Sequence, residues 1–394
     1  MTKKSRKELI EAKKFYKSKD YEDALEIYEK HYSENPEAFN NWDKIFYSWS
    51  LYRVHIKDFE DEDELISSAE TVCELTKQAD LNEAPTCAYT LSVIKVLDHL
   101  YSQKQWEELI IWLEKLDPEL LDDEKGQFND VAYPSKREKY FNYATKAYLE
   151  SYDYEKCIEV SKKALDSMDE FVNGSDIWYR WRIAKSQKEL GEYDEAIKYL
   201  EEISKVKNDW FVSLEIADNY YFKLDNENAL KYAVEAALKP GPADLKVNLY
   251  SLLRDLTCDE YPDEAQKHDY LIYSIRLSKG WPIDDDLREK IIEEGFDSEN
   301  RDYRSIEKKL RDFWNSLKYK DRELLTGTIT KIFPHGKAGF ITGEDDKSYY
   351  FNTFEFKADA SQLREYLSVS FYCEKSFDKS KNRESLKAVN INVL

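Results

Sequence analysis

The sequence predicts a mainly α-helical chain in which a solenoid of helical hairpins is followed by a small five-stranded β-barrel. Two observations carry this prediction. One helical layout recurs through about the first 240 residues, and beyond Leu325 the spacing of apolar residues changes from helical to alternating. We expect repeats over residues 1–243, helices that cap the solenoid over 244–320, and the barrel over 325–394.

Four stretches in the first part share the same layout of a turn, an acidic helical start and then a small residue. They are "SKDYEDALEIYEKHYSENPEA" (18–38), "SYDYEKCIEVSKKALDSMDE" (151–170), "LGEYDEAIKYLEEISKVKND" (190–209) and "LDNENALKYAVEAALKPGPA" (224–243), with Ala24, Cys157, Ala196 and Ala229 at the small position. Twelve residues earlier, a preceding helical pattern places Ala12, Thr145, Ala184 and Ala217. This spacing predicts two helices joined by a tight turn that approach closely at the small residues. A weaker copy spans 103–120, with Leu109 at that position, and residues 37–90 are expected to form an irregular pair.

These repeats resemble the tetratricopeptide repeat (TPR) family, whose unit is about 34 residues long. The spacing is 33 from Ala196 to Ala229 and 39 from Cys157 to Ala196. The resemblance implies a groove that holds a protein or peptide, and the acidic balance of this part favours a basic or neutral partner. Family members that bind a C-terminal carboxylate use basic residues on the groove-facing helix. The candidates here are Lys146, Arg180, Arg182 and Lys185, although charged residues on a helix are also the ordinary composition of a solvated face.

Helical periodicity continues from Asp244 to Lys320 without a clear repeat, and the last helix is expected to end near Tyr319. Beyond it, five short segments rich in branched and aromatic residues predict strands: "TGTITKIF", "AGFIT", "SYYFN", "LSVSFYCE" and "LKAVNINV". Alternation places Ile341, Tyr349 and Phe351 inside the barrel. It places Ala338, Phe340, Tyr350 and Asn352 on the outer face.

An exposed Phe340 beside an exposed Tyr350 is typical of a surface on which bases stack. Two of the 10 glycines, Gly336 and Gly339, fall next to these rings, and Gly339 is expected to let the strands approach closely. Residues 325–394 resemble the cold-shock domain, an OB-fold barrel that binds single-stranded RNA or DNA. In that resemblance "GTITKIF" matches the first strand, and "GKAGFI" and "YYFN" match the two nucleic-acid-binding motifs.

The resemblance implies a nucleic-acid-binding face made of Phe340 and Tyr350 with Lys331, His335, Lys337 and Asn352. The sequence also departs from the family pattern. Lys331 stands where an exposed Trp is usual, Ala338 replaces an aromatic residue, Asn352 stands for a common His, and Thr353 stands for the aromatic residue that follows it. We therefore expect weaker binding than in a free cold-shock protein.

The composition narrows the class of protein. The net charge of the whole chain is -21, but the charge is unevenly distributed. Residues 325–394 contain 10 Lys and Arg and 9 Asp and Glu, whereas residues 1–324 contain 49 Lys and Arg and 71 Asp and Glu. Such acidity argues against a protein that coats duplex DNA. The five cysteines are far apart, the N-terminus has no signal-peptide core and no apolar run is long enough to span a membrane. We expect a cytoplasmic, bacterial protein, and the sequence leaves open whether it forms a homo-oligomer.

The motifs of phosphate-binding loops, serine hydrolases and zinc sites do not occur in the sequence. We therefore expect no enzymatic activity, no cofactor and no metal. The function favoured by the sequence is a protein-binding scaffold whose barrel binds single-stranded RNA or DNA. The alternatives are a pure protein-interaction scaffold, or a regulatory subunit, in which the barrel has lost nucleic-acid binding.

Overall fold

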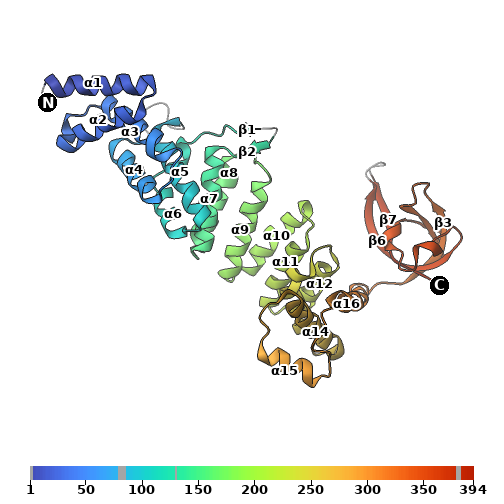
Figure 1. Cartoon of the computed structure of the whole chain (residues 1–394). Helices are drawn as coiled ribbons and strands as arrows, with labels where there is room; N and C mark the ends of the chain where they lie inside the picture. Colours follow the sequence, from blue (N-terminus) through green and yellow to red (C-terminus); the bar gives the residue numbers. More distant parts are fainter. Residues whose placement is uncertain (1–2, 79–85, 129–130, 379–382) are drawn as a thin grey trace. The chain divides into compact units, whose positions relative to one another are not determined.

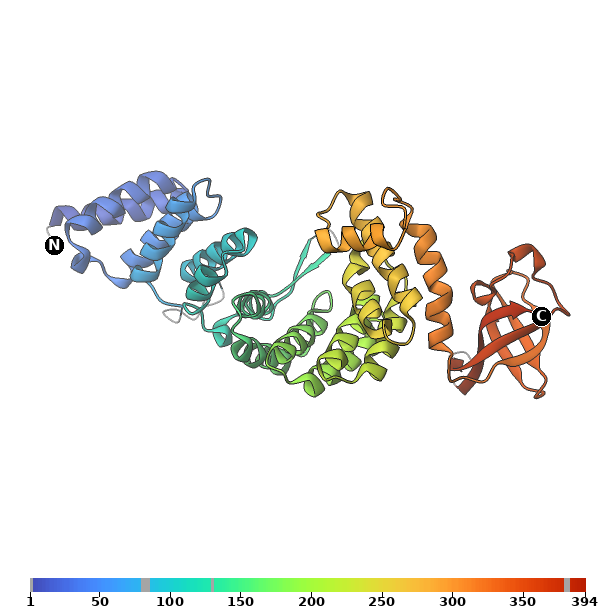
Figure 2. The same ribbon diagram turned by 90° about the horizontal axis from the view of Figure 1, so that it is seen from below.

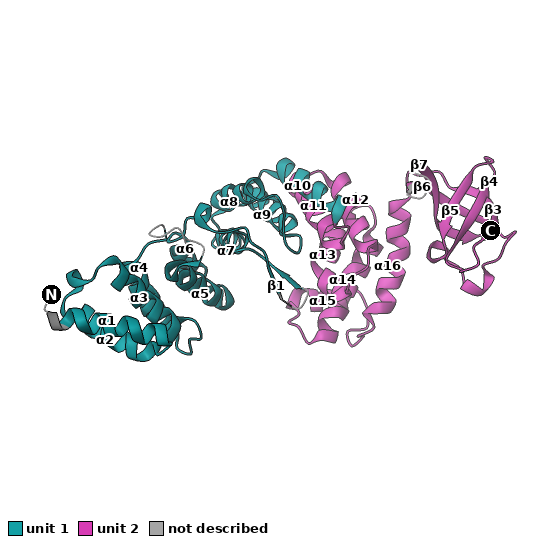
Figure 3. Cartoon of the chain, turned by 90° about the horizontal axis from the view of Figure 1, so that it is seen from above, with its two compact units in different colours: residues 1–206 teal, residues 207–394 magenta. Residues whose placement is uncertain are grey.

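The structure, a computed structural model, describes residues 3–78, 86–128, 131–378 and 383–394. These residues form two compact units, 1–206 and 207–394, coloured separately in Figure 3. Each unit is described by itself below. Among the described residues, no helix combines the length and the apolar composition needed to cross a membrane.

The first unit consists mostly of antiparallel helix pairs, which lie next to each other along the chain in Figures 1 and 2. Its α-helices are α1 (Lys3–Ser18), α2 (Tyr21–Glu34), α3 (Asn41–Leu51), α4 (Glu62–Leu75), α5 (Ala88–Gln103), α6 (Trp106–Leu113), α7 (Lys136–Glu150), α8 (Tyr154–Ser167), α9 (Ser175–Glu189) and α10 (Tyr193–Val206). The α3–α4 pair is irregular, as expected, because a π-helical segment, Tyr52–Ile56, follows α3.

The small residues lie where the two helices of each hairpin meet, which confirms the predicted close approach. Ala12, Ala24, Thr145, Cys157, Ala184, Ala196, Ala217 and Ala229 are each at most 1% exposed. In the α7–α8 pair the Cys157 thiol donates to the carbonyl oxygen of Thr145 at 3.3 Å. A larger side chain at these positions would push the helices apart.

The turns inside the hairpins share one backbone geometry. Lys19, Lys104, Tyr152, Gly191 and Leu224 all have φ between 60° and 78°. In each turn this residue bonds to the carbonyl three residues back, and the next residue bonds to the carbonyl five back, as in Asp153 N–H to Tyr148 O at 3.0 Å. This is the Schellman arrangement that ends a helix. Found in five hairpins, α1–α2, α5–α6, α7–α8, α9–α10 and α11–α12, it gives these five the same reversal of direction.

One element of the first unit was not predicted. Strands β1 (Gly126–Phe128) and β2 (Val131–Tyr133) form a two-stranded antiparallel sheet between the third and fourth helix pairs. Its segments are three residues long, too short for alternation of side chains to stand out in the sequence. Val131 and Tyr133 on β2 are about half exposed.

The second unit begins with the last predicted repeat and continues into the capping helices. Its helices are α11 (Trp210–Phe222), α12 (Asn226–Leu238), α13 (Val247–Thr257), α14 (Pro262–Lys279), α15 (Asp285–Glu293) and α16 (Tyr303–Lys318). Buried residues of α11–α14 and α16 form one apolar cluster. At its centre Trp314 stacks on Tyr250, with ring centroids 5.7 Å apart and planes 7° apart. The end of α16 at Lys318 agrees with the predicted end near Tyr319.

The barrel has the five predicted strands, β3 (Leu325–Ile332), β4 (Ala338–Gly343), β5 (Ser348–Asn352), β6 (Ser368–Asp378) and β7 (Arg383–Val393). They close in the order β3-β4-β5-β7-β6, with β3 paired to β6 and a parallel contact between β5 and β7. Ile329, Ile341, Phe351, Phe371 and Ile391 are fully buried and fill the interior. The chain is therefore mainly α-helical, with TPR-like hairpins followed by a closed OB-type barrel.

His268 is a buried titratable residue in the second unit. Its Nε2 accepts a hydrogen bond from Trp314 Nε1 at 2.9 Å, and its Nδ1 lies 2.7 Å from the carbonyl oxygen of Glu264. This pattern requires a neutral ring that donates from Nδ1. Burial lowers the pKa of His268 from 6.5 to about 4, and the Glu264 carbonyl opposes that shift only in part.

We expect the free energy of unfolding of the second unit to fall by about 2 kcal/mol when the pH is lowered from 7 to 5, because of His268. The unfolded ring binds a proton near pH 6.5, whereas the folded ring does so only near pH 4. The stabilisation is therefore complete above pH 6.5 and decreases as the pH falls towards 4. Urea unfolding of the wild type and of His268→Gln at both pH values, monitored by hydrogen exchange of peptides from α14 and α16, measures this loss of stability. Equal losses in the two proteins would contradict the assignment to His268.

Candidate nucleic-acid interface

The predicted division of strand residues between the two faces of the barrel is confirmed. Ile341, Tyr349 and Phe351 point inward and are at most 2% exposed. Phe340 and Tyr350 are cross-strand partners on the outer face. Ala338 pairs with Asn352 on that face, but it is buried rather than exposed, because its methyl group is shorter than the surrounding side chains.

Three aromatic rings on the outer face contact one another edge to face. The ring centroids of Phe340 and Tyr350 are 5.9 Å apart, and those of Phe333 and Phe340 are 5.6 Å apart. These contacts leave Phe340 and Tyr350 half-buried, so they are less exposed than expected. Phe333, at the end of β3, was missed as part of this face because it lies beyond the last regular position of its strand. Edge-to-face packing holds the rings in fixed orientations.

The predicted polar residues surround these rings. Lys331 is the cross-strand partner of Phe340, and its Nζ lies 5.8 Å from the Phe333 ring centroid. The His335 ring lies 5.5 Å from that of Phe333, and its Nδ1 accepts from the backbone N–H of Lys337 at 3.0 Å. Asn352 Oδ1 accepts from the Tyr350 hydroxyl at 2.8 Å. The structure thus places Lys331, His335 and Asn352 next to the rings, while Lys337 lies in the exposed turn between β3 and β4.

The helices contact a different part of the barrel. Tyr319, just after α16, is 4% exposed and stacks on Tyr372 of β6 with ring centroids 4.3 Å apart and planes 4° apart. Glu374 of β6 pairs with Lys318 at 2.9 Å and with Arg322 at 3.5 Å. Burial opposes the charge of Lys318, but its bond to Glu374 keeps the pKa above the usual value. These contacts lie on β6, whereas Phe340 and Tyr350 lie on β4 and β5.

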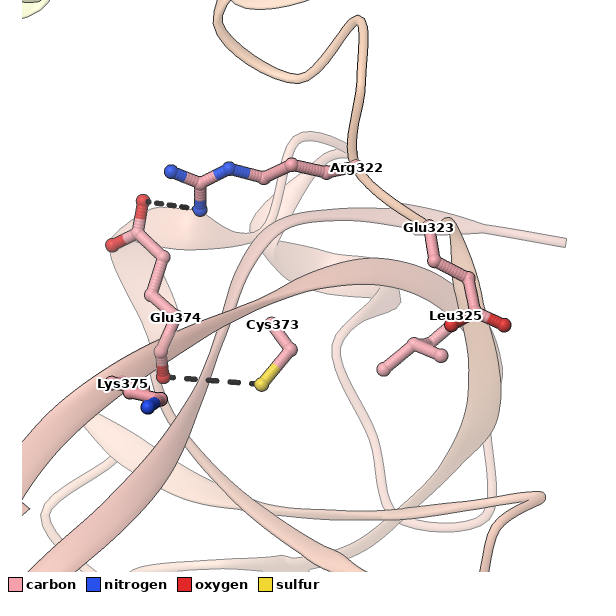
Figure 4. A pocket seen from close by; sticks show the side chains of 6 residues that line it. All are labelled: Arg322, Glu323, Leu325, Cys373, Glu374 and Lys375. Carbon is pink, nitrogen blue, oxygen red and sulfur yellow. Dashed lines mark hydrogen bonds and ion pairs between the residues drawn. The ribbon is translucent and has the colours of Figure 1, made fainter.

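A hollow of about 570 Å³ lies beside this junction, lined by Arg322, Glu323, Leu325, Cys373, Glu374 and Lys375 (Figure 4). Arg322 points towards Glu374, and the Cys373 thiol faces the backbone carbonyl of Glu374 at 3.9 Å. Burial raises the pKa of Cys373, which disfavours the reactive thiolate. Acidic and basic side chains alternate around the hollow, so its lining does not favour one charge of ligand.

The four predicted groove residues lie on α7 and α9. Lys146 pairs with Glu150 on its own helix at 2.6 Å. Arg182 reaches from α9 to Thr145 Oγ1 of α7 at 2.8 Å, and burial lowers its pKa. Lys185 is half-buried on α9.

Arg180 points to the other side of α9. It contacts Asp176 at 2.8 Å and Glu202 of α10 at 3.6 Å. Two residues along a helix turn the side chain through about 200°, which separates Arg180 from Arg182.

A second polar group in the same unit links α5 to α7. Asp98 accepts from Lys139 at 2.8 Å and from the Tyr143 hydroxyl at 2.8 Å, while Tyr143 stacks on Tyr101 at 4.4 Å. Burial, together with Asp98, raises the pKa of Tyr143, so its hydroxyl remains a donor at neutral pH. No local pattern indicates this group, because Lys139 and Tyr143 lie 41 and 45 residues from Asp98 along the chain.

No protein-family model matches the chain, and no curated protein matches it. Among solved structures, it is similar to a tetratricopeptide repeat protein from Parabacteroides merdae, with 16% identity, 73% of this chain and 98% of that chain covered, and a TM-score of 0.34. The apo form of RapI is 15% identical, and the match covers 79% of this chain and 86% of that chain, with a TM-score of 0.43. The complex of the TPR2AB domain of yeast Sti1 with pHSP90 is 15% identical. The match covers 80% of this chain and 97% of that chain, with a TM-score of 0.21. Since all three TM-scores are below 0.5, the fold assignment rests on the helix pairs and strand order described above.

Gly339 lies next to Phe340 on β4, where the strand packs closely against the backbone of β3 and the buried Phe351 ring. A Cβ atom at this position would collide with the carbonyl oxygen of Lys331 and would come within 2.7 Å of the Phe351 ring. Gly336, three residues earlier, has φ 69° and no atom within 4 Å of a Cβ atom built there. The close approach expected at Gly339 is confirmed.

We expect Gly339→Ala to destabilise the barrel by about 1–3 kcal/mol, because the added methyl group must displace backbone and a buried ring. Gly336→Ala is the matched control and should cost only about 1 kcal/mol, from the left-handed backbone alone. Hydrogen exchange of peptides from β4 and β5 reports on the barrel directly. Equal protection in the two variants would show that the space at Gly339 is not limiting.

Proposed function

We propose that this chain is a non-enzymatic adaptor whose helical hairpins bind a protein and whose barrel binds single-stranded RNA or, as the alternative, single-stranded DNA. The observation that carries the second part is the contiguous row of rings at Phe333, Phe340 and Tyr350. A base stacked on such a ring contributes about 1–3 kcal/mol, and stacking does not depend on sequence. We infer that the barrel uses these rings as a platform, in the manner of the cold-shock domains that it resembles.

The distribution of charge supports the same assignment. Residues before Leu325 carry a large excess of Asp and Glu, whereas the barrel is close to neutral. Phosphates are repelled by the first surface and tolerated by the second. The acidic hairpins suit a basic or neutral protein partner. The five cysteines are free, which supports a reducing, cytoplasmic environment.

A second candidate function is a protein-interaction scaffold, or a regulatory subunit, whose barrel does not bind nucleic acid. It is favoured by the departures from the cold-shock pattern at Lys331, Ala338, Asn352 and Thr353, and by the half-burial of the remaining rings. The two candidates differ in one measurable property, the affinity of the full chain for a single-stranded oligonucleotide at low salt.

We expect Phe340→Ala and Tyr350→Ala each to weaken binding of a fluorescent oligouridylate by about 1–3 kcal/mol, since each removes a ring on which a base stacks. Tyr350→Phe keeps the ring and removes only the bond to Asn352, so it should bind nearly as well as the wild type. Fluorescence anisotropy measures the affinities, and hydrogen exchange of β4 and β5 checks that the barrel is folded. Unchanged affinity in both alanine variants with intact barrels would exclude these rings from the site.

The salt dependence should be modest. About two cationic side chains near the rings, such as Lys331 and Lys337, predict a slope of log K against log salt of about -1 to -2 for a single strand. Titrations at several salt concentrations give this slope. A slope steeper than about -4 would mean that phosphate contacts elsewhere dominate, and an absence of binding at low salt would support the scaffold.

A further inference from the structure

The row of residues that includes Phe340 and Tyr350 continues onto β7. Register pairs join Lys331 to Phe340, Phe340 to Tyr350, and Tyr350 to Lys387. Residues directly opposite each other on neighbouring strands project from the same face of a sheet. The outer face therefore extends one strand beyond the rings that the sequence indicated, and Lys387 occupies the next position.

Phe354 lies beside Lys387. It belongs to a short 3₁₀ turn, Thr353–Glu355, that follows β5 directly, and its ring is 72% exposed. The Nζ of Lys387 lies 5.4 Å from the Phe354 ring centroid, within the range of a cation–π contact. Phe354 is not among the residues of the barrel core. Its position on the surface therefore contributes little to folding.

Lys387 is held in place by Glu355. The Oε1 atom of Glu355 lies 2.8 Å from Lys387 Nζ, and its Oε2 accepts from the backbone N–H of Asn390 at 3.3 Å. The side chains of Glu355 and Lys387 are 15% and 21% exposed, respectively. The charge of Lys387 is thus neutralised by a fixed carboxylate, and the ammonium group supports the Phe354 ring rather than projecting into solvent.

We propose that Phe354 is a further stacking position for a base, so that a bound single strand runs from Phe340 across Tyr350 to Phe354. Lys387 and Glu355 are positioning residues that orient the Phe354 ring. This inference rests on the proposed binding of single-stranded nucleic acid. It adds a residue that the cold-shock resemblance does not indicate, and it predicts a longer binding site than Phe340 and Tyr350 alone provide.

The test compares oligouridylates of about four and about ten nucleotides, which span the range of site sizes that OB folds cover. With the full chain, Phe354→Ala should weaken binding of the long oligonucleotide by about 5- to 100-fold, because one stacked base is lost. Binding of the short one, which Phe340 and Tyr350 can hold, should change less than twofold. Phe354→Trp should restore the affinity for the long oligonucleotide.

A matched control is Tyr152→Ala, which removes a ring that is 77% exposed in the first unit and should leave both affinities unchanged. Hydrogen exchange of β5 and β7 confirms that each variant is folded. If the wild type binds the long oligonucleotide and Phe354→Ala binds it equally well, stacking at Phe354 is excluded while the proposed function stands. If the wild type binds neither oligonucleotide, the proposed function fails, and this inference fails with it.

Discussion

The close contact of small side chains between the two helices of a hairpin is the constraint on which the helical part of the chain depends. At Ala184 and Ala196, or Ala217 and Ala229, the paired helices leave no room for a larger group. A Schellman turn then fixes how the second helix leaves the first. Because both features recur, the hairpins of each unit share one internal geometry.

The tight turn is achieved in most hairpins without glycine. Lys19, Lys104, Tyr152 and Leu224 adopt the left-handed conformation, and Gly191 occupies the equivalent position in one pair. A non-glycine residue in this conformation costs about 1–2 kcal/mol. The hydrogen bonds of the turn and the contact between the helices offset that cost, so the geometry is imposed by the hairpin as a whole.

The elements that follow from local periodicity could be predicted, and those that depend on distant partners could not. Spacing located the small residues of the hairpins, and alternation separated Ile341 and Phe351 from Phe340 and Tyr350. The link from Arg182 to Thr145 depends on how α9 packs on α7, which no local pattern encodes. No local pattern distinguishes Phe354, because it follows the end of β5, where alternation stops. β1 and β2 were missed because their segments are too short to show a period.

The stack of Tyr319 on Tyr372 has a consequence for where the barrel begins as a folding unit. Tyr319 lies before the first strand, yet its ring covers part of β6, and Lys318 and Arg322 neutralise Glu374 nearby. A fragment that starts at Leu325 would expose the Tyr372 ring and leave a carboxylate without its two cations. Such a fragment would tend to self-associate through the bare ring, and its aggregation would imitate a loss of ligand binding. The last turn of α16 is therefore structurally part of the barrel.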